Sequence, residues 1–362
     1  MTSFFPGLWL IVGLELRQRV RGASWYVLIG IFAFVLLAVT VLFTWFTVST
    51  PGVDSGGPLY SVIMYIVLLL STLMTPAFSG SAINGDRDTG TLATTQVTLI
   101  TTGQLVVGKF LAAWVSALAF LVVSLPFIIV AVTLGGLSPV TIVTSALILV
   151  AELGIFAAIG VGLSGLLGRA LFSVVVSYLA IAALCAGSLI AFGLLTLVTR
   201  SDVVVTQTNV SASSGDPSTT DPSQITCDPP TTYTYPVPRY DYYWWMLASN
   251  PYVVVADATP GSFSKEGMPS DLFTIIATGV RTAQHAPDLT VTDDYCAQVK
   301  AEAGGGRNTA SGPTPKQVYE SSVPSWFVGL GIHILLAAGL LAGALARTRT
   351  PARRLSKGSR IA

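Results

Sequence analysis

The sequence predicts an all-α polytopic membrane protein with six transmembrane helices and an extracellular segment of irregular or α-helical structure. Hydrophobic residues make up 52% of the 362-residue chain and charged residues only 10%, whereas a soluble domain has about 25% charged residues. The apolar residues are gathered in six blocks, and a helix of about 20 apolar residues crosses a bilayer. The predicted spans cover residues 25–48, 59–83, 110–134, 139–167, 171–198 and 326–346.

The positions of the basic residues predict the topology. Seven of the 19 Lys and Arg residues lie in segment 200–325, and the other twelve all fall in cytoplasmic segments if the N-terminus is inside. Lys and Arg near the ends of spans are retained on the cytoplasmic side. We therefore expect a multi-pass plasma-membrane protein with both termini in the cytoplasm and a basic tail at 347–362. Topology accounts for this positive charge, so no nucleic-acid partner is expected.

Residues 1–24 predict an amphipathic helix that lies in the cytoplasmic interface of the membrane. Apolar residues recur at helical spacing and arginines follow them, which is typical of interfacial helices. A disordered tail is the alternative. The expected apolar face consists of Phe4, Leu8, Ile11, Leu14 and Val20, and the polar end of Arg17, Arg19 and Arg21.

Segment 200–325 separates spans one to five, residues 25–199, from span six, residues 326–346. Residues 201–238 are rich in Ser, Thr, Pro and Asp, which disfavours a packed core. An aromatic group at 240–245 suits the outer membrane interface. Apolar residues then recur at helical spacing from Asp271 to Arg281, which predicts an amphipathic helix, and residues 303–316 resemble a flexible linker.

Two of the three cysteines, Cys227 and Cys296, fall in the predicted outer segment. Oxidation is permitted outside the cell, so a disulfide between them is expected, although two unpaired thiols fit the spacing as well. Cys185 lies in span five.

Most enzyme classes lack the residues they need. The chain has two histidines, which leaves little material for a zinc hydrolase or a histidine-based triad, and His333 is expected to be a packing or interface histidine. Residues 103–109 match the phosphate-binding pattern GxxxxGK, but Phe110 replaces the Ser or Thr that binds magnesium. We therefore expect no catalytic residue, no metal site and no nucleotide site in this chain.

The loop between spans two and three, residues 84–109, carries the most specific pattern. It contains Asn84-Gly85-Asp86-Arg87, then Gly90-Thr91-Leu92, and finally Gly108-Lys109 before span three. This loop resembles that of the ABC-2 family of ABC exporter permeases, as do the interfacial first helix and the six spans. Ser249-Asn250-Pro251-Tyr252 also resembles a step found before the last span of actinobacterial members. Asp88 stands where the family often has Glu, and the outer segment is longer than in compact members.

The resemblance implies a permease subunit that moves an unidentified, lipophilic or amphipathic substrate outward. It also implies an ABC ATPase as a separate partner, which uses the ATP and Mg, and a second permease copy or paralogue, while this chain binds no cofactor. A charged turn followed by apolar residues suits the docking of a short helix into a partner groove, and a plain solvated connector is the alternative. The expected ATPase-coupling residues are Asp86, Arg87, Gly90, Thr91, Leu92, Val97 and Leu99.

Glu152 is the one charged residue inside a predicted span, which makes it a candidate functional site by default. The competing interpretation is structural, with Glu152 hydrogen-bonded to Ser145, Ser164 or a neighbouring helix, and this is the one we favour. A different function class also fits the chain: a non-transporting membrane sensor or scaffold whose outer segment binds a ligand.

Overall fold

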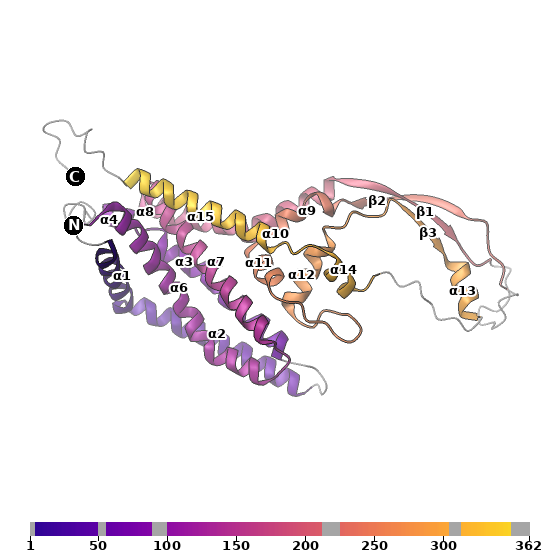
Figure 1. Cartoon of the computed structure of the whole chain (residues 1–362), viewed down its shortest axis with the longest axis horizontal. Helices are drawn as coiled ribbons and strands as arrows, with labels where there is room; N and C mark the ends of the chain where they lie inside the picture. Colours follow the sequence, from indigo (N-terminus) through magenta and orange to yellow (C-terminus); the bar gives the residue numbers. More distant parts are fainter. Residues whose placement is uncertain (1–3, 50–55, 89–99, 212–224, 304–312, 349–362) are drawn as a thin grey trace.

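The computed structural model describes residues 4–49, 56–88, 100–211, 225–303 and 313–348. Six helical segments are long and apolar enough to cross a membrane, which confirms the predicted fold class. They are α2 (Ala23–Val48), α3 (Gly56–Ser79), α6 (Thr102–Thr133), α7 (Pro139–Leu166), the joined α8 (Ala170–Ala182), η1 (Ala183–Gly187) and α9 (Ser188–Val198), and α15 (Trp326–Thr348). Figure 1 shows α1 and the end of α15 at one end of this bundle and a β-sheet at the opposite end.

Helix α6 begins at Thr102, earlier than the apolar block at residue 110 predicts. Thr101 and Gln104 form a capping box. The backbone amide of Gln104 donates to Thr101 Oγ1 (3.2 Å), and the backbone amide of Thr101 donates to Gln104 Oε1 (2.7 Å). Such a box satisfies free amides of the first turn and fixes the start of a helix. The segment that matched the phosphate-binding pattern is therefore helical and forms no phosphate-binding loop.

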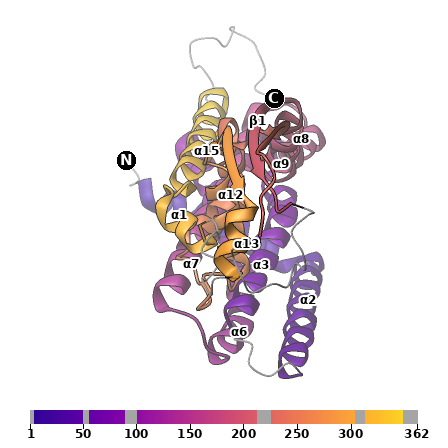
Figure 2. The ribbon, with the colours of Figure 1, turned by 90° about the vertical axis from the view of Figure 1, so that its right-hand side faces the viewer.

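Helix α7 lies at the centre of the bundle and packs against α3, α6 and α15. Its large residues Leu149, Leu153 and Phe156 are fully buried. A Cβ added at Gly162 would lie 2.6 Å from the Cβ of Leu340 on α15, so the glycine permits a close approach of the two helices. Helix α2, in contrast, lies at the edge of the bundle (Figure 2).

The N-terminal helix α1 (Phe4–Arg21) packs along α6, and α4 (Asn84–Asp88) lies at the same end of the bundle. The face that α1 turns to the bundle differs in part from the expected apolar face. Leu8 and Ile11 are buried, but Phe4, Leu14 and Val20 are exposed. The reason is that Glu15 and Arg19 turn toward the bundle and pair there.

Segment 200–325 contains a three-stranded sheet that the sequence pattern did not predict. Strand β1 (Arg200–Thr208) pairs antiparallel with β2 (Thr231–Pro238) and parallel with β3 (Thr290–Asp294). The expectation that 201–238 lacks packed structure is wrong at both ends of this range. Val203 and Val205 alternate into the buried side of β1, and the Thr and Tyr residues of β2 favour strands.

Short helices connect the sheet to the spans. They are η3 (Tyr240–Tyr242), α10 (Trp244–Ala248), α11 (Pro251–Ala258), α12 (Leu272–Thr282), α13 (Tyr295–Ala303) and α14 (Pro315–Ser321). Helix α12 is the expected amphipathic helix, with Asp271 as its N-cap. A disulfide joins Cys227 to Cys296 at the start of α13.

Candidate functional site

Three ionisable residues meet where α1, α4 and α6 come together, and we call them the charged cluster. Lys109 of α6 forms ion pairs with Asp86 of α4, at 2.7 Å, and with Glu15 of α1. Its side chain is only 3% exposed, and a buried ammonium group is stable only when it is paired. The cluster therefore fixes three separate segments of the chain to one another.

Helix α1 is also held at both ends. Near its end, Arg19 donates to Ser116 Oγ and to the carbonyl of Phe78, each at 3.1 Å. Burial lowers the pKa of Arg19, and nearby Glu15 opposes this effect. At its start, Gln104 Nε2 donates to the carbonyl of Phe4 (2.9 Å). Helix α1 is thus a fixed part of the bundle.

The Gly108-Lys109 pair combines two physical roles. A Cβ added at Gly108 would lie 2.9 Å from Cγ2 of Ile11, so a glycine here allows α1 to lie directly on α6. The next residue, Lys109, supplies the charge that pairs with Glu15 and Asp86.

The structure describes only the beginning of the expected coupling loop. Arg87 donates to Asn84 Oδ1 (3.2 Å) and to the carbonyl of Leu167 (3.4 Å), at the turn that follows α7. Ser164 Oγ accepts from the amides of Ile83 and Asn84. These contacts attach α4 to the end of α7. The remaining expected residues, Gly90, Thr91, Leu92, Val97 and Leu99, lie outside the described residues.

Glu152 pairs with His333, the only other Asp, Glu, Lys, Arg or His residue of the predicted spans. Its Oε1 lies 2.9 Å from Nδ1 of His333, whose Nε2 donates to the carbonyl of Ser249 at 2.8 Å. Because a carbonyl only accepts, Nε2 carries a proton, and a further proton lies between Nδ1 and Oε1. Both side chains are completely buried. In the described part of the chain, Glu152 Oε2 has no hydrogen-bond partner.

Glu152 is hydrogen-bonded, as expected, but its partner is His333 of the neighbouring helix α15 rather than Ser145 or Ser164. Those serines are engaged elsewhere, since Ser145 bonds to Tyr60 (2.7 Å) and Ser164 accepts the amides that precede α4. Glu152 consequently joins α7 to α15 and, through His333, to the turn between α10 and α11.

That turn is inserted among the spans. Asn250 caps α11 by accepting from the amide of Tyr252 (2.9 Å), and its Nδ2 donates to the carbonyl of Cys185 and to Ser188 Oγ. Cys185 lies in the π-helical turn η1. Such turns are rare in proteins, and those that occur are often found at functional sites. The Asn-Pro step seen in the sequence therefore connects the outer segment to the fifth span.

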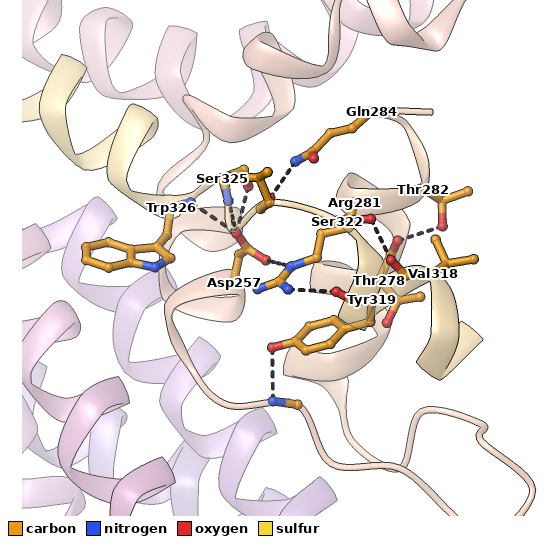
Figure 3. A network of polar contacts seen from close by, with 12 residues as sticks. Asp257, Thr278, Arg281, Thr282, Gln284, Val318, Tyr319, Ser322, Ser325 and Trp326 are labelled. Atoms are coloured by element: carbon orange, nitrogen blue, oxygen red, sulfur yellow. Dashed lines mark hydrogen bonds and ion pairs between the residues drawn. The ribbon is translucent and has the colours of Figure 1, made fainter. Parts of the chain in front are cut away.

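A buried ion pair lies at the end of the bundle that carries segment 200–325 (Figure 3). Arg281 of α12 donates from Nε to Asp257 Oδ1 of α11 (2.6 Å) and from Nη1 to the carbonyl of Tyr319 (2.9 Å). Asp257 Oδ2 accepts from Ser325 Oγ (2.9 Å), from the amide of Ser325 and from the amide of Trp326 (3.0 Å), where α15 begins. This network ties α11, α12 and α14 to span six.

An apolar cavity of about 620 Å³ opens between α9, α10 and α12 at the same end of the bundle. Phe192, Leu247 and Ile275 contribute to its walls. Ile275 is 56% exposed, so a large apolar side chain of α12 remains uncovered at the cavity.

Sequence reasoning missed Glu15, and it gave His333 no partner. Both carried a signal: Glu15 is the one acidic residue before the first span, and His333 and Glu152 are the only Asp, Glu, Lys, Arg or His residues in the six predicted spans. Within the described ranges, no group of three or more His, Cys, Asp or Glu side chains is placed to hold a metal ion.

Comparison with known proteins adds no family assignment. No protein-family model matches this sequence, and none of the curated proteins matches it either.

Proposed function

We propose that this chain is the membrane-spanning subunit of an ATP-driven exporter of the ABC-2 type. The charged cluster is the observation that carries the proposal, because it joins both ends of loop 84–109 to the interfacial helix and to a membrane span. A separate ATPase subunit that hydrolyses ATP with Mg docks on this loop, and a second permease copy or paralogue completes the transporter. The end of the bundle that holds α1 faces the cytoplasm.

The connections of the loop support a role in transmitting movement. Helix α6 contains 32 residues, so at a rise of 1.5 Å per residue it is about 48 Å long and extends from the loop across the bundle. Arg87 and Ser164 attach the other end of the loop to α7, which pairs with span six through Glu152 and His333. A displacement of the loop would therefore reach the outer turn at Ser249.

The apolar outer cavity supports a lipophilic or amphipathic substrate. Its walls come from a span, α9, and from outer helices α10 and α12, so it lies where a substrate leaving the bundle would pass. Ligand sites are commonly concave and apolar with few polar groups.

A membrane sensor is the second candidate, because the Asp257–Arg281 pair fixes the outer helices directly to the start of α15. A ligand that bound the outer segment would bias span six through these bonds.

Purification of the tagged chain from its native membrane distinguishes the two functions. For an exporter, a chain with complete nucleotide-binding motifs co-purifies, and liposomes containing both chains export an amphipathic fluorescent probe only with ATP and Mg. The same liposomes with a non-hydrolysable nucleotide are the control. A chain that purifies alone and supports no nucleotide-dependent efflux would favour the sensor.

A further inference from the structure

A second cavity, of about 440 Å³, lies at the end of the bundle that carries α1 and α4. It is formed by the turn between α7 and α8, the first residues of α8 and the end of α15. Its walls consist of Leu166, Leu167, Gly168, Arg169, Phe172 and Arg347. We propose that this cavity binds the phosphate headgroup of an anionic phospholipid of the bilayer.

The charge of the cavity favours an anion. Arg169 and Arg347 come from distant parts of the sequence and line the same space, and no carboxylate is among the lining residues. In the described part of the chain, neither guanidinium forms a hydrogen bond or an ion pair. A guanidinium group presents a planar set of donors that matches a phosphate. Two such groups at one cavity are suited to a single phosphate.

The backbone beside Arg169 is held in place by α4. Arg87 donates to the carbonyl of Leu167 at 3.4 Å, and Leu167 lines the cavity. This contact adds a third positive charge next to the site and holds the turn from which Arg169 projects. The cavity is therefore supported by α4 as well as by the spans.

The apolar surroundings identify a lipid as the occupant rather than a small free anion. Leu171 is 79% and Phe172 is 56% exposed at the start of α8, where the fifth span begins. A headgroup bound between Arg169 and Arg347 would place its acyl chains along this apolar surface. Basic sites between spans on the cytoplasmic side bind anionic headgroups, and a free phosphate would leave the apolar walls without a function.

The site can be tested by native mass spectrometry of the detergent-purified chain, with any subunit that co-purifies, titrated with phosphatidylglycerol. We expect phosphatidylglycerol to bind in preference to phosphatidylcholine. Each basic residue contributes about a fivefold factor in affinity at an anionic surface, so Arg169→Gln with Arg347→Gln should raise the titration midpoint about 30-fold. This outcome does not depend on whether the chain is an exporter.

The matched control is Arg17→Gln with Arg21→Gln, which removes two exposed arginines at the same end of the bundle and should leave the midpoint unchanged. An equal loss in the control pair would mean diffuse surface charge and would overturn the site. Competition by inorganic phosphate at the same concentrations would overturn the lipid assignment. Equal binding of both lipids by the unsubstituted chain would overturn the proposal without any variant.

Discussion

Substitution of His333 should destabilise the bundle more than substitution of Glu152. His333→Leu leaves Glu152 Oε1 and the Ser249 carbonyl without their partners. Each buried unpaired group costs about 1–3 kcal/mol, so the expected loss is about 2–6 kcal/mol. Glu152→Leu leaves only Nδ1 of His333 unpaired, for a loss of about 1–3 kcal/mol. Glu152→Gln keeps a hydrogen bond to Nδ1 and should retain most stability and transport.

The assay is the free energy of unfolding in mixed micelles for the single variants and for the variant with both leucines. The double variant leaves only the Ser249 carbonyl unpaired, so the combined loss should be smaller than the sum of the single losses by the cost of two unpaired groups, about 2–6 kcal/mol. Losses that add fully, or a His333→Leu variant as stable as Glu152→Leu, would refute the pairing. A severe transport defect in a stable Glu152→Gln protein would instead assign the carboxylate a direct role in transport.

Three further outcomes are expected. Lys109→Met should destabilise the protein by about 1.5–3 kcal/mol, since it removes the ammonium group that pairs with both Glu15 and Asp86. The free energy of unfolding in micelles measures this loss, and a neutral result would contradict the charged cluster. The Asp271→Asn variant should be as stable as the unsubstituted protein at low pH and more stable than it near pH 7, measured as the free energy of unfolding. Burial raises the pKa of Asp271, hydrogen bonds from Thr274 only partly opposing this, so stability falls as pH rises through that pKa; parallel pH profiles would contradict it. The disulfide joins residues 69 positions apart and should contribute about 4 kcal/mol to the free energy of unfolding. Cys227→Ser should therefore speed proteolysis of segment 200–325. An unchanged rate under non-reducing conditions would contradict a bracing role.

Hydropathy alone was sufficient to predict the six spans, because each apolar block is long enough to cross a bilayer. It failed at the start of α6, where the capping box of Thr101 and Gln104 begins the helix at Thr102, before the apolar block that starts at residue 110. The hairpin of β1 and β2 was missed for a similar reason. Only Val203 and Val205 mark its buried side, and the surrounding Ser, Thr and Pro content dominated the interpretation.

The long-range pairs of the candidate site could be predicted only in part. The sequence identifies Glu152 and His333 as the only Asp, Glu, Lys, Arg or His residues of the predicted spans, but spacing cannot show that two residues 181 positions apart meet. The same limit applies to Glu15 and Lys109, which are 94 positions apart. Such pairs depend on how the helices pack, and helix packing is not encoded in any one local pattern.

The most direct test of the proposed function is the ATPase rate of the reconstituted transporter with Arg87→Glu and Leu92→Asp in the coupling loop. Arg87 connects α4 to the turn after α7, and Leu92 belongs to the apolar part of the loop, so the pair should remove both charge and apolar contact with the ATPase. A single charge at the rim of an interface can contribute less than about 1 kcal/mol, which is why both residues are changed. Arg17→Glu is the control. We predict that substrate-stimulated ATP hydrolysis is lost while membrane insertion and the six spans are retained. Normal assembly and normal stimulated hydrolysis in this double variant would contradict the role of the loop and, with it, the proposed coupling.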